Sequence, residues 1–167
     1  MRTRNAVILF ALAFLLRPLL QVLLPGWLTL DVSLCLLIAI SMTMTRDEMV
    51  GPLIAAFVFE GINDLCFTQH VGVTPIAMVV MVTFILLIRM RFDVENAIID
   101  LLIIFISFVL YHSTYWLIYW LLGAPYSYFY MAERLTYLLP VEVAITGIIL
   151  YFMVRVKIQK RRDSYFK

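Results

Sequence analysis

Charged residues are scarce in this chain: only 14% of its 167 residues are Asp, Glu, Lys or Arg, whereas 64% are hydrophobic. A soluble globular domain carries about 25% charged residues and somewhat less than 50% apolar ones. A domain of this length has too much surface for its volume to hide so many apolar side chains from water. The composition therefore excludes an ordinary soluble domain and indicates that lipid surrounds most of the chain.

Cysteine and histidine are rare as well, at two residues each. Cys35 and Cys66 lie within apolar runs, which favours buried packing residues over a disulfide or a metal site. The sequence contains no H-E-x-x-H, G-x-S-x-G or P-loop motif. We therefore expect no enzymatic activity, no cofactor and no metal ion. The alternative, an intramembrane enzyme, would need His112 and an acid to converge.

Long apolar runs make up most of the sequence. A bilayer core about 30 Å thick needs roughly 20 helical residues to cross it. Turn signals such as Pro25-Gly26 and Gly123-Ala124-Pro125 separate the runs. The sequence thus predicts an all-α membrane protein with six transmembrane helices in a single domain, 1–167. The predicted spans are residues 5–24, 27–44, 49–68, 73–88, 97–122 and 135–154, followed by a basic cytoplasmic tail at 155–167.

The basic residues predict the orientation of these spans. With the N-terminus in the cytoplasm, 11 of the 13 Lys and Arg residues fall on the cytoplasmic side: two near the N-terminus, three in loops and six in the tail. Only Arg134 falls outside, and Arg17 lies within a span. Since cytoplasmic loops carry the excess of basic residues, we expect both termini in the cytoplasm. The basic tail would also meet anionic lipids of the inner leaflet.

Charged residues inside the predicted spans are costly, so each is a candidate for a structural or functional role. Arg17 and Glu60 both lie near mid-depth, given a rise of about 1.5 Å per residue. Asp64 is one turn beyond Glu60 and shares its helical face. We expect Arg17 to pair with Asp64 or Glu60, with Glu142 as the other candidate, because an unpaired charge in lipid is strongly unfavourable.

A proton or ion path is the functional alternative for these charges. Glu60 and Asp64 would then form a coupled pair of carboxyl groups that titrate together. Such a path needs polar residues on several helices, and the predicted span 73–88 offers almost none. The structural role is therefore favoured.

The fifth predicted span carries an aromatic face. Its members recur at three- and four-residue spacing, which places them on one side of a helix. The pattern favours helix packing together with an aromatic belt at the membrane surface; the alternative is a stacking wall for a ligand or a partner helix. The face consists of Phe108, Tyr111, His112, Tyr115, Trp116 and Tyr119.

The most specific motif lies between the third and fourth predicted spans. Asp64-Leu65 is followed by a short polar turn and by Gly72, eight residues after the aspartate, and the next span ends at Arg89 and Arg91. This pattern resembles the bacterial rod shape-determining protein MreD family. The motif covers about 20 residues, whereas the length and the six predicted spans match over the whole chain.

Two further positions bear on the resemblance. Asp31, near the start of the second predicted span, is similar to the Asp or Asn of the family there. Glu60 stands where the family usually has glycine, and Gly61 follows it. Together with the charges inside the spans, these positions give the candidate structural or partner-interface residues, which are Arg17, Asp31, Glu60, Gly61, Asp64, Gly72 and Glu142.

The resemblance implies a non-catalytic scaffold of the cell-elongation complex in the bacterial inner membrane, with a role in cell shape and peptidoglycan synthesis. It implies a fold similar to the six-helix substrate-binding (S) component of energy-coupling-factor vitamin transporters. The implied partners are a bitopic MreC-like protein, the cell-wall polymerase and transpeptidase, and, indirectly, the actin-like MreB. Nucleic acid is not among them.

A vitamin-binding S component is the alternative function. It predicts an outward-facing cavity lined by polar and aromatic groups, which the aromatic face and the segment 126–130 could supply. Such components dock their ATPase module through small residues of the first span. Here that span offers only Ala6, Ala11 and Ala13, without A-x-x-x-A spacing, which disfavours the transporter.

Overall fold

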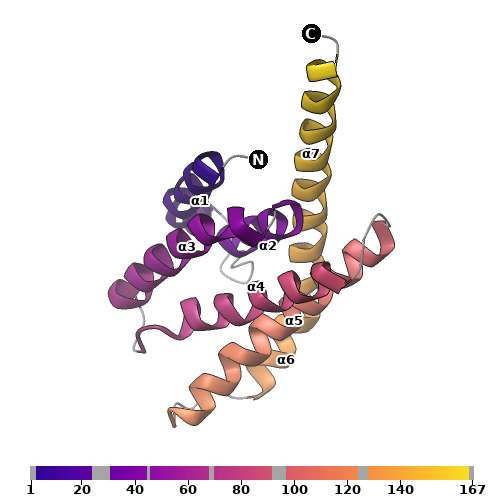
Figure 1. Cartoon of the computed structure of the whole chain (residues 1–167). Helices are drawn as coiled ribbons and strands as arrows, with labels where there is room; N and C mark the ends of the chain where they lie inside the picture. The colour runs from indigo at the N-terminus through magenta and orange to yellow at the C-terminus, as the bar shows by residue number, and fades with distance from the viewer. Residues whose placement is uncertain are drawn as a thin grey trace.

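The computed structural model of the chain describes residues 3–23, 31–44, 46–67, 70–91, 97–123 and 128–165. Within these ranges the chain is helical apart from short turns and contains no strand, which confirms the predicted all-α fold (Figure 1). The helices are α1 Thr3–Leu23, α2 Val32–Thr43, α3 Arg46–Phe67, α4 Val73–Arg91, α5 Ala97–Leu121, α6 Tyr128–Tyr137 and α7 Leu139–Tyr165.

Helix α2 lies at the centre of the bundle. All of its residues from Ser33 to Thr43 are buried, and it packs against α1, α4 and α7. Apart from a few hydroxyls its side chains are apolar on every face, as expected for a helix surrounded by protein. Its 12 residues extend only about 18 Å. α2 is thus shorter than the predicted span 27–44, of which residues 27–30 lie outside the described ranges.

Helices α1, α3, α4, α5 and α7 pack around α2, and α6 contacts α5 and α7. α1 packs against α3, α3 against α4, α4 against α5, and α5 against α7. In Figure 1, α1 and α3 lie on one side of α2 and α7 on the other. Because α2 contacts both α1 and α7, it brings together segments from the beginning and the end of the chain.

The C-terminal part of the chain differs most from the prediction. The sequence predicts a connection at 123–134 and a sixth span at 135–154, whereas the structure has the short helix α6 and then α7, which begins at Leu139 and continues to Tyr165. Pro140 explains the break, because a proline ring clashes with the carbonyl four residues earlier but fits the first turn of a new helix. No glycine or proline follows Gly147, so nothing in the sequence stops α7 before the tail.

Two helical segments in the described ranges are long and apolar enough to cross a membrane. They are Glu48–Cys66, with a mean hydropathy of 1.4, and Ile98–Leu121, with 1.9. Core helices of soluble proteins also reach such values, but those are mostly buried, whereas only 28% and 33% of an 18-residue stretch within the respective segments is buried. Both therefore turn most of their apolar surface outward. They overlap the third and fifth predicted spans, and the crossing of a membrane by all six spans stays a prediction.

Candidate functional site

Four acidic side chains that the sequence places inside the predicted spans are buried. Asp31 is 6% exposed, and Glu60, Asp64 and Glu142 are 0% exposed. Burying a carboxylate costs several kcal/mol unless hydrogen bonds or an opposite charge compensate it. The partners of these four groups therefore define the candidate site.

Asp64, near the end of α3, holds the start of α4. Its Oδ2 accepts hydrogen bonds from the backbone N–H groups of Gly72, at 3.1 Å, and of Thr74, at 3.0 Å. Its Oδ1 accepts from the Thr74 hydroxyl at 2.7 Å. The first N–H groups of a helix have no partner within the helix, and the helix dipole favours negative charge there. Asp64 thus caps α4 from the preceding helix.

Gly72 has a conformation that explains its residue type. Its φ is +93°, in the left-handed region that side chains other than glycine rarely adopt. A Cβ at this position would meet no atom within 4 Å, so the requirement comes from the backbone and not from lack of space. The eight-residue spacing of the Asp64–Gly72 motif therefore corresponds to a direct hydrogen bond that closes the turn between α3 and α4.

Asp31, Ser33 and Glu60 form a second contact, between α2 and α3. The Ser33 hydroxyl lies 2.7 Å from Asp31 Oδ1 and 2.7 Å from Glu60 Oε1. It carries a single proton and donates to one of the two carboxyl groups at a time. Asp31 is also the N-cap of α2, since its Oδ1 accepts from the Leu34 N–H at 3.3 Å. The contact therefore places two acids at the start of the buried helix α2.

Arg17, the predicted partner of the buried acids, belongs to α1, but its side chain lies outside the part of the chain that the structure describes. α1 packs against α2 and α3, the helices that carry Asp31 and Glu60. The pairing of Arg17 with Asp64, Glu60 or Glu142 stays a prediction.

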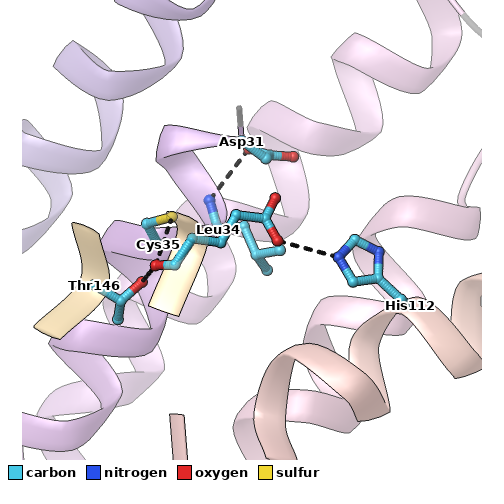
Figure 2. Close-up of polar contacts among 6 residues, drawn as sticks. Asp31, Leu34, Cys35, His112 and Thr146 are labelled. Atoms are coloured by element: carbon cyan, nitrogen blue, oxygen red, sulfur yellow. Dashed lines mark hydrogen bonds and ion pairs between the residues drawn. The ribbon is translucent and has the colours of Figure 1, made fainter. Parts of the chain in front are cut away.

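His112 and Glu142 join α5 to α7. His112 Nε2 lies 3.3 Å from Glu142 Oε2, with the two side chains 7% and 0% exposed. The backbone oxygen of Glu142 accepts from the hydroxyl of Thr146 at 2.8 Å and from the thiol of Cys35 in α2 at 3.8 Å. Figure 2 shows His112 facing the start of α2, where Asp31 and Cys35 lie. The contact therefore brings α2, α5 and α7 together.

The second carboxyl oxygen of Glu142 stands out. Glu142 Oε1 is buried and has no hydrogen-bond partner among the described residues. A buried polar atom of this kind usually binds water or another group. His112 thus contacts an acidic side chain of another helix, Glu142. The Oε1 atom of Glu142 is available to accept a hydrogen bond from water or another group.

The aromatic face of α5 forms a ladder towards the α3–α4 turn. The rings of Tyr111 and Tyr115 have centroids 6.2 Å apart, and those of Tyr115 and Tyr119 are 4.8 Å apart. The Tyr115 hydroxyl donates to the Tyr119 hydroxyl at 3.3 Å. His70, in the turn, meets Tyr119 edge-on at 5.4 Å. These contacts are those of packed rings, the interpretation that the sequence favours.

Phe108 and Trp116 lie apart from this ladder. Phe108 is 0% exposed and belongs to the hydrophobic core. Trp116 stacks on Trp120 with centroids 6.4 Å apart, and Trp120 is 59% exposed. The predicted aromatic face is thus divided between the core, the ladder and the half-buried Trp116, which stacks on the exposed Trp120.

Arg89 has a role that the sequence does not reveal. Its Nη1 donates to the backbone oxygens of Ser41, at 3.2 Å, and Met44, at 3.3 Å, at the C-terminal end of α2. A cation is favourable at this end of a helix. Burial lowers the pKa of Arg89, and the negative charge of Asp100 opposes that shift. The sequence marks Arg89 only as a basic residue at the end of a span, because its partners are distant in the chain.

Gly61, on α3, has open space around it, since a Cβ there would meet no atom within 4 Å. The packing of the chain itself therefore does not require glycine at this position.

Comparisons of the chain with protein-family models, with curated proteins and with solved structures found no match.

Proposed function

We propose that the protein is a non-catalytic scaffold of the bacterial cell-elongation complex. It crosses the inner membrane six times with both termini in the cytoplasm. The observation that carries this proposal is the hydrogen-bonded turn of Asp64, Gly72 and Thr74. The two residues of the MreD-like motif thus contact each other and shape one turn, which is the kind of constraint that would keep them at a fixed spacing.

The outward-facing apolar surface supports the membrane part of the proposal. Ile54, Phe57 and Leu65 on α3 are 49% to 66% exposed, and Ile98 and Leu102 on α5 are 74% and 55% exposed. Apolar surfaces of this kind are stable in contact with lipid. Helices are also suited to lipid because their backbone N–H and C=O groups bond to one another within the helix.

The use of the polar groups supports a scaffold. Asp64 ties α3 to α4, Ser33 ties α2 to α3, Arg89 ties α4 to α2, and His112 ties α5 to α7. Buried polar groups that bond to one another rigidify and specify a helix arrangement. A rigid bundle with short connections has its binding surface on its sides, within the membrane.

The turn itself offers such a lateral surface. Leu65 and Val71 are 66% and 57% exposed. The hydrogen bond from the Gly72 N–H to Asp64 fixes the backbone of the turn that carries them. Gly61 lies one helical turn before Leu65, and a small residue lets another helix approach closely. We assign this surface to a partner within the membrane, in the first place the MreC-like protein; the synthases and, indirectly, MreB belong to the same complex.

Affinity capture from native membranes tests the proposal. The tagged protein is purified in mild detergent, and the proteins that accompany it are identified by mass spectrometry. We expect a bitopic protein with a large extracytoplasmic domain together with a cell-wall polymerase and transpeptidase. Asp64→Ala should still insert but recover less of these partners, and Asn63→Ala serves as the matched control. Equal recovery by both variants would exclude the turn as the binding surface.

The second candidate is a substrate-binding S component, and the unpartnered oxygen of Glu142 favours it. Glu142 Oε1, His112 and the Tyr111–Tyr119 ladder would then contact a small aromatic ligand. Capture of two ATPases and a membrane coupling subunit, with a small molecule in the purified protein, would replace the scaffold by this function.

A further inference from the structure

The C-terminal part of α7 extends beyond the bundle. Among the side chains of α7 that the structure describes, which end at Arg155, Leu150 is the last buried one, and Val154 and Arg155 are exposed. The helix nevertheless continues to Tyr165, and in Figure 1 this part, in yellow, projects past the ends of the other helices. This projecting part of α7 is a candidate for contacts with a molecule other than the chain itself.

An aromatic pair marks the place where α7 leaves the bundle. Tyr151 and Phe152 are each 59% exposed, with centroids 5.8 Å apart. The guanidinium of Arg155 lies over the Tyr151 ring at 5.9 Å from its centroid. Aromatic rings prefer the boundary between lipid chains and water, and a basic residue one turn further reaches the headgroups.

The segment beyond this pair is strongly basic. Residues 155–167 contain six Lys and Arg residues and a single acid, Asp163. Four of the basic residues, Lys157, Lys160, Arg161 and Arg162, fall within about 10 Å of Arg155 along the helix. This is close to the distance of about 8 Å over which charges interact at physiological ionic strength.

We propose that residues 155–165 of α7 bind the headgroups of anionic phospholipids. The inference rests on the proposed function, because it requires α7 to leave the membrane near Tyr151. The aromatic pair sets the depth, and the basic helix supplies the charge complementary to a phosphate-rich surface. Each basic residue near such a surface raises binding about fivefold, so the four that follow Arg155 act together.

The test compares two variants of the full chain. In one, Lys157, Lys160, Arg161 and Arg162 are replaced by Gln; in the other, each Lys is exchanged for Arg and each Arg for Lys, which keeps the charge. Both variants and the wild type are reconstituted into vesicles of equimolar phosphatidylglycerol and phosphatidylcholine. The protein is then purified in mild detergent, and the two lipids that remain bound are quantified by mass spectrometry.

We expect phosphatidylglycerol to be enriched about tenfold or more on the wild type and on the charge-preserving variant, and to fall to the vesicle ratio on the Gln variant. An equal ratio on all three proteins would overturn the inference and leave an acidic protein as the ligand class for this charge. Alkaline extraction of the vesicles keeps the two proposals apart: a chain that stays in the membrane without lipid enrichment contradicts only the inference, whereas a chain that is extracted contradicts the proposed function.

Discussion

Asp64 accepts hydrogen bonds from two residues that follow it by eight and ten positions, Gly72 and Thr74. The carboxylate is 0% exposed, so water cannot replace these bonds. At the scale of single residues, the turn therefore depends on one acceptor group and on one glycine with a positive φ. The two requirements are separate and lead to separate predictions.

Removing the acceptor should destabilise the protein. Asp64→Ala is expected to lower the free energy of unfolding by about 2–4 kcal/mol, because the N–H groups of Gly72 and Thr74 lose their acceptor. Asp64→Asn keeps one acceptor oxygen and should cost less. Asn63→Ala, at the neighbouring position, should change stability by less than about 0.5 kcal/mol. Thermal unfolding of the purified protein in detergent measures the three variants; equal losses for Asp64→Ala and Asn63→Ala would contradict the cap.

The two glycines of the motif region should respond with opposite signs. Gly72→Ala is expected to cost about 1–2 kcal/mol, because an L side chain is unfavourable at φ +93°. Gly61→Ala should stabilise the protein by about 0.5–1 kcal/mol, because alanine favours a helix interior and the position has open space. The same unfolding experiment applies, and a neutral Gly72→Ala would show that the turn has another conformation.

At the scale of elements, α2 is fixed at both ends by charged side chains. Asp31 caps its first turn, and Arg89 binds the carbonyl groups of its last turn. Negative charge at the start and positive charge at the end both match the helix dipole. A helix of three turns has few backbone hydrogen bonds of its own, so its ends contribute much of its stability.

Loss of the Arg89 cap should loosen the end of α2. In Arg89→Gln, amide hydrogen exchange at residues 40–44 is expected to become roughly 5–20-fold faster, which corresponds to about 1–2 kcal/mol of local stability. Arg4→Gln, which removes an exposed arginine of α1, is the control. Unchanged exchange in Arg89→Gln would mean that packing alone holds this end.

The contact between α5 and α7 is tested by a double-mutant cycle. His112→Ala and Glu142→Ala are each expected to destabilise the protein, and the double variant should cost less than the sum by about 0.5–3 kcal/mol, because the two side chains contact each other. Purely additive losses would show that the contact contributes nothing beyond the packing of each side chain.

The sequence predicts the positions of most helices but not the identity of the central one. Apolar runs locate α3 and α5, because lipid and the protein interior both favour apolar side chains. For the same reason, the apolar run at 32–43 does not reveal that protein, and not lipid, surrounds that helix. Pro140 indicates the break between α6 and α7. The absence of glycine and proline after Gly147 indicates that α7 continues far towards the C-terminus.

The contacts of the buried acids could be predicted only in part. The Asp64–Gly72 spacing is local and points to the turn. Ser33 and Thr74 as partners, and the contact between His112 and Glu142, depend on how distant helices pack. The hydroxyl residues carry no signal of their own, because serine and threonine within apolar helices most often bond to the backbone of their own helix, as Ser107 does.

At the scale of the whole molecule, the described residues form a bundle with buried acidic side chains inside an apolar core and with many large apolar side chains on its outer surface. The apolar outer surface is unfavourable in water, and it suits a protein that lipid surrounds. In the proposed topology, 11 of the 13 basic residues lie on the cytoplasmic side. The basic C-terminal part of α7 is expected on the same side.

Mapping the topology in living bacteria tests whether the chain crosses the membrane six times with both termini in the cytoplasm. A fluorescent protein, which fluoresces only in the cytoplasm, and alkaline phosphatase, which is active only outside it, are fused in turn within 92–96, within 124–127 and after Lys167. We expect fluorescence at the first and third positions, phosphatase activity at the second, and a chain that resists alkaline extraction. The opposite pattern, or recovery of the chain in the soluble fraction, would contradict the six-span membrane scaffold.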